Sequence, residues 1–107
     1  MLGSALVTCT GVTTTYLIGD HLQLKRKART VPKTEQNPAG ILFAVVGQAR
    51  LRDQFRDVIR IDNYPHHDMG THVHVNGRVL HLPEIVDPNR AMEYVEHYLK
   101  QKYPELV

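Results

Sequence analysis

The dipeptide Asn76-Gly77 constrains the fold of this chain more than any other feature of its sequence. It stands between two short runs of alternating apolar residues, where Asn-Gly is the strongest local signal for a β-hairpin, because both central residues of a type I′ turn need a positive φ. Pairing outward from this turn places His74 opposite Val79. Two residues further out, His72 lies opposite His81. Side chains alternate along a strand, so these four side chains are predicted to share one face of the hairpin.

The other face of the predicted hairpin is apolar and is expected to point toward the core. It carries Val73, Val75, Leu80 and Leu82. The segment 62–74, which leads into the hairpin, holds four of the seven histidines of the chain, namely His66, His67, His72 and His74. Polar loops at the ends of strands on a rigid sheet are frequent functional sites. This segment is therefore the first candidate for a site.

The size and composition of the chain indicate an ordinary globular protein. With 107 residues it is expected to form a single domain over residues 1–107. The single cysteine, Cys9, excludes an internal disulfide and a Cys-rich zinc site, which fits a reducing cytoplasmic setting. No apolar run approaches the about 20 residues of a membrane-spanning helix. The start of the chain lacks the positively charged region of a signal peptide. No association with a membrane is expected.

Several β-prone stretches precede the hairpin. Residues 5–18 are rich in Val and Thr, with a break at Gly11, and residues 21–29 follow a turn at Gly19-Asp20. Residues 41–46 are apolar on both alternations, which is typical of a central strand, and residues 58–62 form a further strand. The charged stretch between those two strands is compatible with either a short helical turn or a long hairpin end.

One helix is predicted, at the C-terminal end of the chain. Asp87 is the N-cap, Pro88 occupies the first helical position, and the helix runs to about Tyr103. Its apolar stripe consists of Ala91, Met92, Val95, Tyr98 and Leu99. The predicted fold class is α+β, an antiparallel sheet of about five to six strands with this one helix packed on it.

The run Lys25-Arg26-Lys27-Ala28-Arg29 gives the predicted strand at residues 21–29 a basic face, with Lys25, Lys27 and Arg29 on one side. One interpretation is a solvated face that protects a sheet edge. The other is a track for a phosphate backbone, together with Arg78 from the hairpin. The sequence leaves both open.

Three roles compete for the histidine cluster. In the first, one imidazole takes the proton of an RNA 2′-hydroxyl and another protonates the leaving 5′ oxygen, because histidine titrates near neutral pH. Arg60 would then stabilise the phosphate. In the second, His72, His74 and His81 hold zinc or another transition metal, since an H-x-H pair with a facing histidine can supply three nitrogen ligands. In the third, the histidines are solvated or structural residues of a protein-interaction module without catalysis.

The run Arg60-Ile61-Asp62-Asn63-Tyr64-Pro65-His66-His67, followed by His72-x-His74, resembles the small toxin-like proteins of the TumE type, also described as a prokaryotic domain of unknown function. Ile61 stands where the family has an aromatic residue, and the spacer before His72 is shorter than usual. The likeness covers about fifteen residues in detail; elsewhere it is architectural, with strands first and one helix last.

The resemblance implies a toxin of a type II toxin–antitoxin system, whose partner is a DNA-binding antitoxin of helix-turn-helix type. Matching positions give a candidate catalytic role to Arg60, Asp62, Asn63, His66, His67, His72 and His74. Cleavage of RNA follows only by analogy with other small toxins. The leading hypothesis is thus a metal-independent endoribonuclease with no cofactor, and a homodimer through an edge strand is compatible with it.

Overall fold

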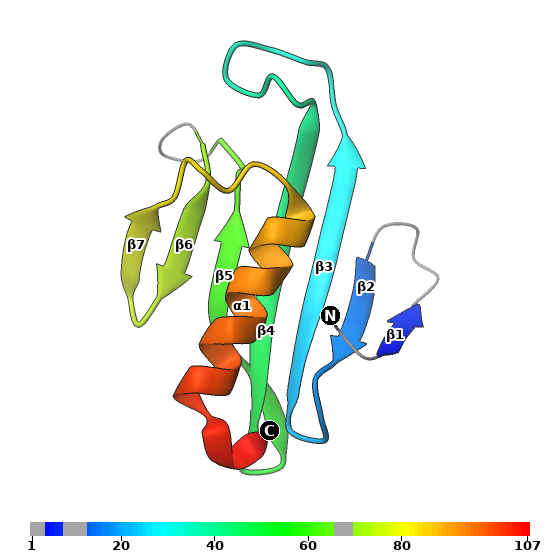
Figure 1. The fold of residues 1–107 in the computed structure, drawn as a ribbon, viewed down its shortest axis with the longest axis vertical. Coiled ribbons are helices and arrows are strands. Elements are labelled where there is room, and N and C mark those ends of the chain that lie inside the picture. Colours follow the sequence, from blue (N-terminus) through cyan, green and yellow to red (C-terminus); the bar gives the residue numbers. More distant parts are fainter. Residues whose placement is uncertain (1–3, 8–12, 66–69) are drawn as a thin grey trace.

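The computed structural model describes residues 4–7, 13–65 and 70–107. They form one seven-stranded sheet in which every strand is antiparallel to the next and the spatial order equals the chain order (Figure 1). One α-helix and a short 3₁₀ turn follow the sheet. The elements are β1 (Ser4–Val7), β2 (Thr13–Leu17), β3 (Leu22–Thr30), β4 (Ile41–Leu51), β5 (Gln54–Asp62), β6 (His72–Val75), β7 (Arg78–His81), α1 (Pro88–Lys102) and η1 (Pro104–Leu106).

The predicted fold class, an antiparallel α+β fold with one C-terminal helix on the sheet, is confirmed. The described residues contain seven strands where about five to six were expected. Cys9 lies outside the described residues. No helix among the described residues is long and apolar enough to cross a membrane.

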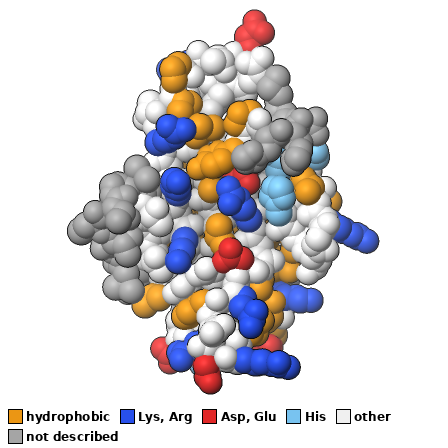
Figure 2. All heavy atoms as spheres, turned by 180° about the vertical axis from the view of Figure 1, so that it is seen from behind, with side chains coloured by type: hydrophobic (Ala, Val, Ile, Leu, Met, Phe, Trp, Pro, Cys, Tyr) orange, Lys and Arg blue, Asp and Glu red, His pale blue; other side chains and the backbone are white. Residues whose placement is uncertain are grey.

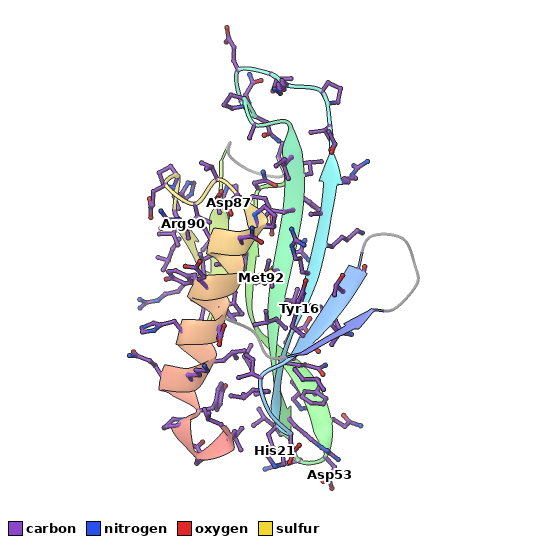
Figure 3. All side chains as sticks on the ribbon, turned by 45° about the vertical axis from the view of Figure 1, so that its right-hand side comes forward. Tyr16, His21, Asp53, Asp87, Arg90 and Met92 are labelled. Carbon is purple, nitrogen blue, oxygen red and sulfur yellow. The ribbon has the colours of Figure 1, made fainter. Side chains whose placement is uncertain are left out.

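Helix α1 begins and ends where its sequence predicts. The Asp87 side chain accepts a hydrogen bond from the Arg90 backbone N–H at 2.9 Å, and Figure 3 shows both residues at the start of the helix. Pro88 occupies the first turn, and Tyr103 is the C-cap. The Tyr103 hydroxyl has a raised pKa, chiefly because burial disfavours the phenolate and also because Tyr98 and Glu105 lie near it.

The helix lies across the middle of the sheet, over β3, β4 and β5. Its stripe of Ala91, Val95 and Leu99 is fully buried against apolar side chains of these strands, including Leu24, Phe43, Val45, Ile59 and Ile61. Gly47 of β4 permits this close approach. A Cβ atom there would lie 2.6 Å from Ile59 Cγ2 and 2.7 Å from Val95 Cγ1, well inside van der Waals contact.

Two hairpin turns, one between β4 and β5 and one between β6 and β7, have left-handed backbone. Asn76 and Gly77 have φ of 53° and 72°, as the predicted type I′ hairpin requires. The predicted register is confirmed: His72 pairs with His81, and His74 pairs with Val79. The charged stretch after residue 47 is a hairpin end, because β4 and β5 pair up to a turn at Arg52-Asp53, where φ is 52° and 67°.

The two faces of the sheet differ. One face packs on α1; the other carries no second layer within the part of the chain that the structure describes. We call this second side the open face. Helix α1 does not extend over β7, so one prediction about the hairpin is wrong: Leu80 is 45% exposed instead of facing the core. Val73 is fully buried, and Val75 and Leu82 are partly buried against the core, as expected.

Candidate functional site

The strand pairings place the predicted site residues in two neighbouring rows across the open face. The first row contains Lys25, Val46, Arg60, His74 and Val79, which face one another on five successive strands. The second row contains Lys27, Ala44, Asp62, His72 and His81 on the same strands. Neighbouring strands lie about 4.8 Å apart, so residues from distant parts of the sequence become close neighbours.

Asp62 is the centre of the polar contacts in these rows. Its side chain is only 1% exposed, although it is a carboxylate at the end of β5. Oδ2 accepts a hydrogen bond from Arg60 Nε at 2.8 Å and lies 3.5 Å from His74 Nε2. Oδ1 accepts a hydrogen bond from the Tyr64 backbone N–H at 3.0 Å. A buried carboxylate normally has such partners, because its desolvation is costly without them.

The two hairpin histidines of β6 differ in their exposure. His74 is 37% exposed, with Nε2 directed to the Asp62 carboxylate, so it combines access to solvent with an orienting partner. His72 was predicted on the polar face, yet it is only 3% exposed. Its Nε2 is buried without a hydrogen-bond partner within the described residues. His74 is therefore the solvent-accessible imidazole of β6, and His72 occupies a packing position.

His81 joins the cluster from β7, as the hairpin geometry predicted. Its ring meets that of His72 edge to face, with 4.9 Å between the ring centroids. The rings of His72 and His74 lie 6.3 Å apart. His81 is exposed and lies diagonally across the hairpin from His74. The open face thus presents two accessible imidazoles on either side of a buried one.

Asn63 has a structural contact that sequence reasoning missed. Its Oδ1 accepts a hydrogen bond from the Phe43 backbone N–H at 2.9 Å, and its Nδ2 donates to the Ile41 carbonyl at 2.8 Å. These bonds continue the pairing of β5 with β4 beyond Asp62. Both polar atoms of the Asn63 amide are hydrogen-bonded to the backbone of β4, so the side chain holds the C-terminal end of β5 in place.

Comparisons with known proteins add no relative. No family model, no curated protein and no solved structure matches this chain. The TumE-type resemblance therefore stays a prediction from the sequence. We base the proposal for a function chiefly on the geometry of the open face.

The basic residues divide between two regions. Lys25 and Lys27 project from the open face, and with Arg60 and Tyr64 they border a hollow there. Figure 2, which views the molecule from the side opposite α1, shows Lys and Arg side chains near the middle of this face with histidine beside them. Arg29 lies on the same side of β3, further toward its end.

Arg78 stands apart from the lysines of β3. It pairs with Val75, so it belongs to the other alternation of the hairpin. It borders a separate pocket near the hairpin tip, whose lining also includes Arg60 and His74. Arg60 is thus common to both hollows.

Two further predictions concern His66 with His67 and the alternative metal site. His66 and His67 lie outside the described residues. Among the residues that are described, no group of three or more His, Cys, Asp or Glu side chains is placed to hold a metal ion. The alternative metal site of His72, His74 and His81 stays a sequence hypothesis.

One contact near the cluster was not predicted at all. The guanidinium of Arg60 lies over the ring of Tyr64, 5.7 Å from its centroid. The only sequence signal for it is the spacing of an arginine and an aromatic residue around the end of β5. This stacking and the bond to Asp62 together fix the direction of the Arg60 side chain.

Proposed function

We propose that this protein is a small toxin-like endoribonuclease that cleaves RNA by general acid–base catalysis on the open face of its sheet. The observation that carries the proposal is the contact of an accessible imidazole, His74, with a buried carboxylate, Asp62, which also binds Arg60, on the same face of the sheet as Lys25 and Lys27. An oriented imidazole next to positive charge is the equipment that phosphodiester cleavage needs.

In the proposed reaction His74 is the general base. It removes the proton of a 2′-hydroxyl, whose oxygen then attacks the adjacent phosphorus. The Asp62 carboxylate stabilises the resulting imidazolium and fixes the orientation of the ring, because it lies 3.5 Å from Nε2. Proton removal by a positioned group typically accelerates a reaction by about 10²–10⁴-fold.

A second imidazole must protonate the departing 5′ oxygen so that the P–O bond breaks. Among the described residues we assign this role to His81, which is exposed and diagonal to His74 on the hairpin. Its ring contact with His72 supports its orientation. Arg60 is placed to neutralise the phosphate charge that grows in the transition state, since its side chain is 42% exposed.

The toxin hypothesis also supplies a partner. We propose that an antitoxin of helix-turn-helix type binds this chain and blocks the open face, which would explain how a cell tolerates an active ribonuclease. The support for this partner is the sequence resemblance of residues 60–74. Co-purification from cells that carry the neighbouring gene tests it.

The experiment that tests the activity is cleavage of a labelled single-stranded RNA by purified protein without a histidine tag. We expect His74→Gln and His81→Gln to lower the rate by about 100-fold or more. His97→Gln is the matched control, because His97 is an exposed histidine on α1, on the other side of the sheet. Equal rates for His74→Gln and His97→Gln would contradict the assignment.

The same assay separates this proposal from the metal alternative. Acid–base catalysis by imidazoles is expected to continue in the presence of a chelator. Loss of cleavage after chelation, with recovery on addition of Zn²⁺, would instead favour a metal site that uses the same rings. Absence of cleavage under all conditions would favour an interaction module.

A further inference from the structure

The open face has a hollow next to the acid–base cluster, with which it shares Arg60. It lies between the basic strand β3 and the end of β5, and Lys25, Lys27, Ala44, Val46, Arg60 and Tyr64 border it. Its volume is about 190 Å³. Clefts for drug-sized ligands measure roughly 300–1,000 Å³, so this hollow suits one unit of a chain better than a larger free ligand.

Small side chains create the hollow. Ala44 and Val46 of β4 occupy the two rows at positions between the lysines of β3 and the Arg60–Asp62 pair of β5. Long side chains therefore stand on both sides of a short apolar floor. The neighbouring strands are about 4.8 Å apart, which places the lysine column about 10 Å from the Arg60 column and about 14 Å from His74.

The walls of the hollow have complementary chemistry. Lys25 and Lys27 are exposed on one side and supply positive charge. On the other side Tyr64 supplies an aromatic ring, held by the guanidinium of Arg60 at 5.7 Å and by the hydrogen bond from its backbone N–H to Asp62. Cations for a backbone and an aromatic surface for a base are the two elements of single-strand recognition.

We propose that this hollow is a nucleotide subsite that binds one unpaired residue of single-stranded RNA. The base rests on Ala44 and Val46 against the Tyr64 ring, and its phosphate binds Lys25 and Lys27. The strand then crosses the sheet along the two rows, so that the following phosphate lies at Arg60 and His74. The choice of RNA rests on the proposed function, whereas the binding of a single strand follows from the hollow itself.

This geometry makes double-stranded RNA a poor ligand. A paired base presents its face to its neighbours in the stack, so it cannot lie on the apolar floor. Sequence preference is expected to be weak, because every base has a face that can stack on tyrosine. Binding should weaken as salt rises, since the lysines displace counterions from the phosphates.

The test is fluorescence anisotropy with a labelled hexamer of 2′-O-methyl RNA, which lacks the attacking hydroxyl and is not cleaved. Tyr64→Ala is expected to raise the dissociation constant by roughly 5- to 150-fold, the loss that accompanies removal of one stacked base. Tyr64→Phe should bind nearly as wild type. Val46→Trp, which fills the hollow without a change in charge, should also lower the affinity.

The control for charge is a matched pair of double variants. Lys25→Gln with Lys27→Gln removes two cations from the open face, and Lys100→Gln with Lys102→Gln removes two from α1, on the opposite side of the sheet. Only the first pair should weaken binding. Equal weakening by both pairs, or equal affinity for the hexamer and its duplex, would overturn the subsite.

The experiment also separates this inference from the proposed function. Binding by wild type and by His74→Gln without any cleavage of ordinary RNA would leave the subsite standing and remove the ribonuclease. Cleavage of RNA together with unchanged hexamer affinity in Tyr64→Ala, Val46→Trp and the β3 double variant would support the ribonuclease and overturn the subsite.

Discussion

Replacement of Asp62 by asparagine is expected to lower the free energy of unfolding by about 2 kcal/mol. The change keeps the shape of the side chain and an oxygen that can accept from the Tyr64 N–H. It removes the charge and turns an NH₂ group toward Arg60 Nε, which in the wild-type protein donates a hydrogen bond to Asp62 Oδ2 at 2.8 Å. A hydrogen bond to a charged group contributes about 1.5–3 kcal/mol. We use the lower part of that range, because Arg60 is 42% exposed and can bond water instead.

Equilibrium unfolding in urea measures this loss. With a slope of about 1.5 kcal/mol/M, the transition midpoint should fall by about 1.3 M. Asp57→Asn on the same strand is the control, because Asp57 is exposed and keeps an acceptor for Gln48 Nε2. Its cost should be within about 0.5 kcal/mol.

A double-mutant cycle with Arg60→Gln isolates the contact itself. The coupling energy between residues 60 and 62 should reach about 1 kcal/mol or more, as is usual for contacting charged groups. A coupling below about 0.3 kcal/mol, or equal costs for Asp62→Asn and Asp57→Asn, would refute the view that Asp62 organises this cluster.

Two further substitutions test how the fold supports the site. Asn63→Ala should lower the free energy of unfolding in urea by about 2 kcal/mol, because the Phe43 N–H loses its acceptor. Asn89→Ala, on the exposed side of α1, should be nearly neutral. Similar costs for the two variants would mean that the hydrogen bonds of the Asn63 amide do not stabilise the fold. Gly47→Ala should cost about 1–3 kcal/mol through the clash with Ile59 and Val95. Gly19→Ala, whose added Cβ meets nothing closer than 3.8 Å, should be tolerated. A larger drop in melting temperature for Gly19→Ala than for Gly47→Ala would contradict the packing described for Gly47.

The sequence was most informative where local chemistry decides the structure. Asn76-Gly77 determined the hairpin register, because few other residue pairs adopt two successive positive φ values. Asp87-Pro88 located the start of α1 in the same way. The turn at Arg52-Asp53 has the same left-handed backbone without glycine, so its sequence left a helical turn and a hairpin equally open.

The site was predictable in its composition and less so in its exposure. Alternation placed His72, His74 and His81 on one face, and this arrangement of strand positions is present. It could not predict that Leu80 is exposed, because this depends on the reach of α1, which does not extend over β7, and it could not predict that His72 is buried on the face away from α1. The Asn63 bridge to Phe43 joins residues 20 positions apart, a contact that no local pattern encodes.

The chemistry of the RNA ends tests the central claim most directly. Attack by a 2′-hydroxyl with His74 as base leaves a 2′,3′-cyclic phosphate on one fragment and a 5′-hydroxyl on the other. Mass spectrometry of the products, formed by wild-type protein in the presence of a chelator, should find these ends and find them strongly reduced for His74→Gln. Fragments with 3′-hydroxyl and 5′-phosphate ends, or cyclic phosphate in equal yield from His74→Gln, would contradict the account.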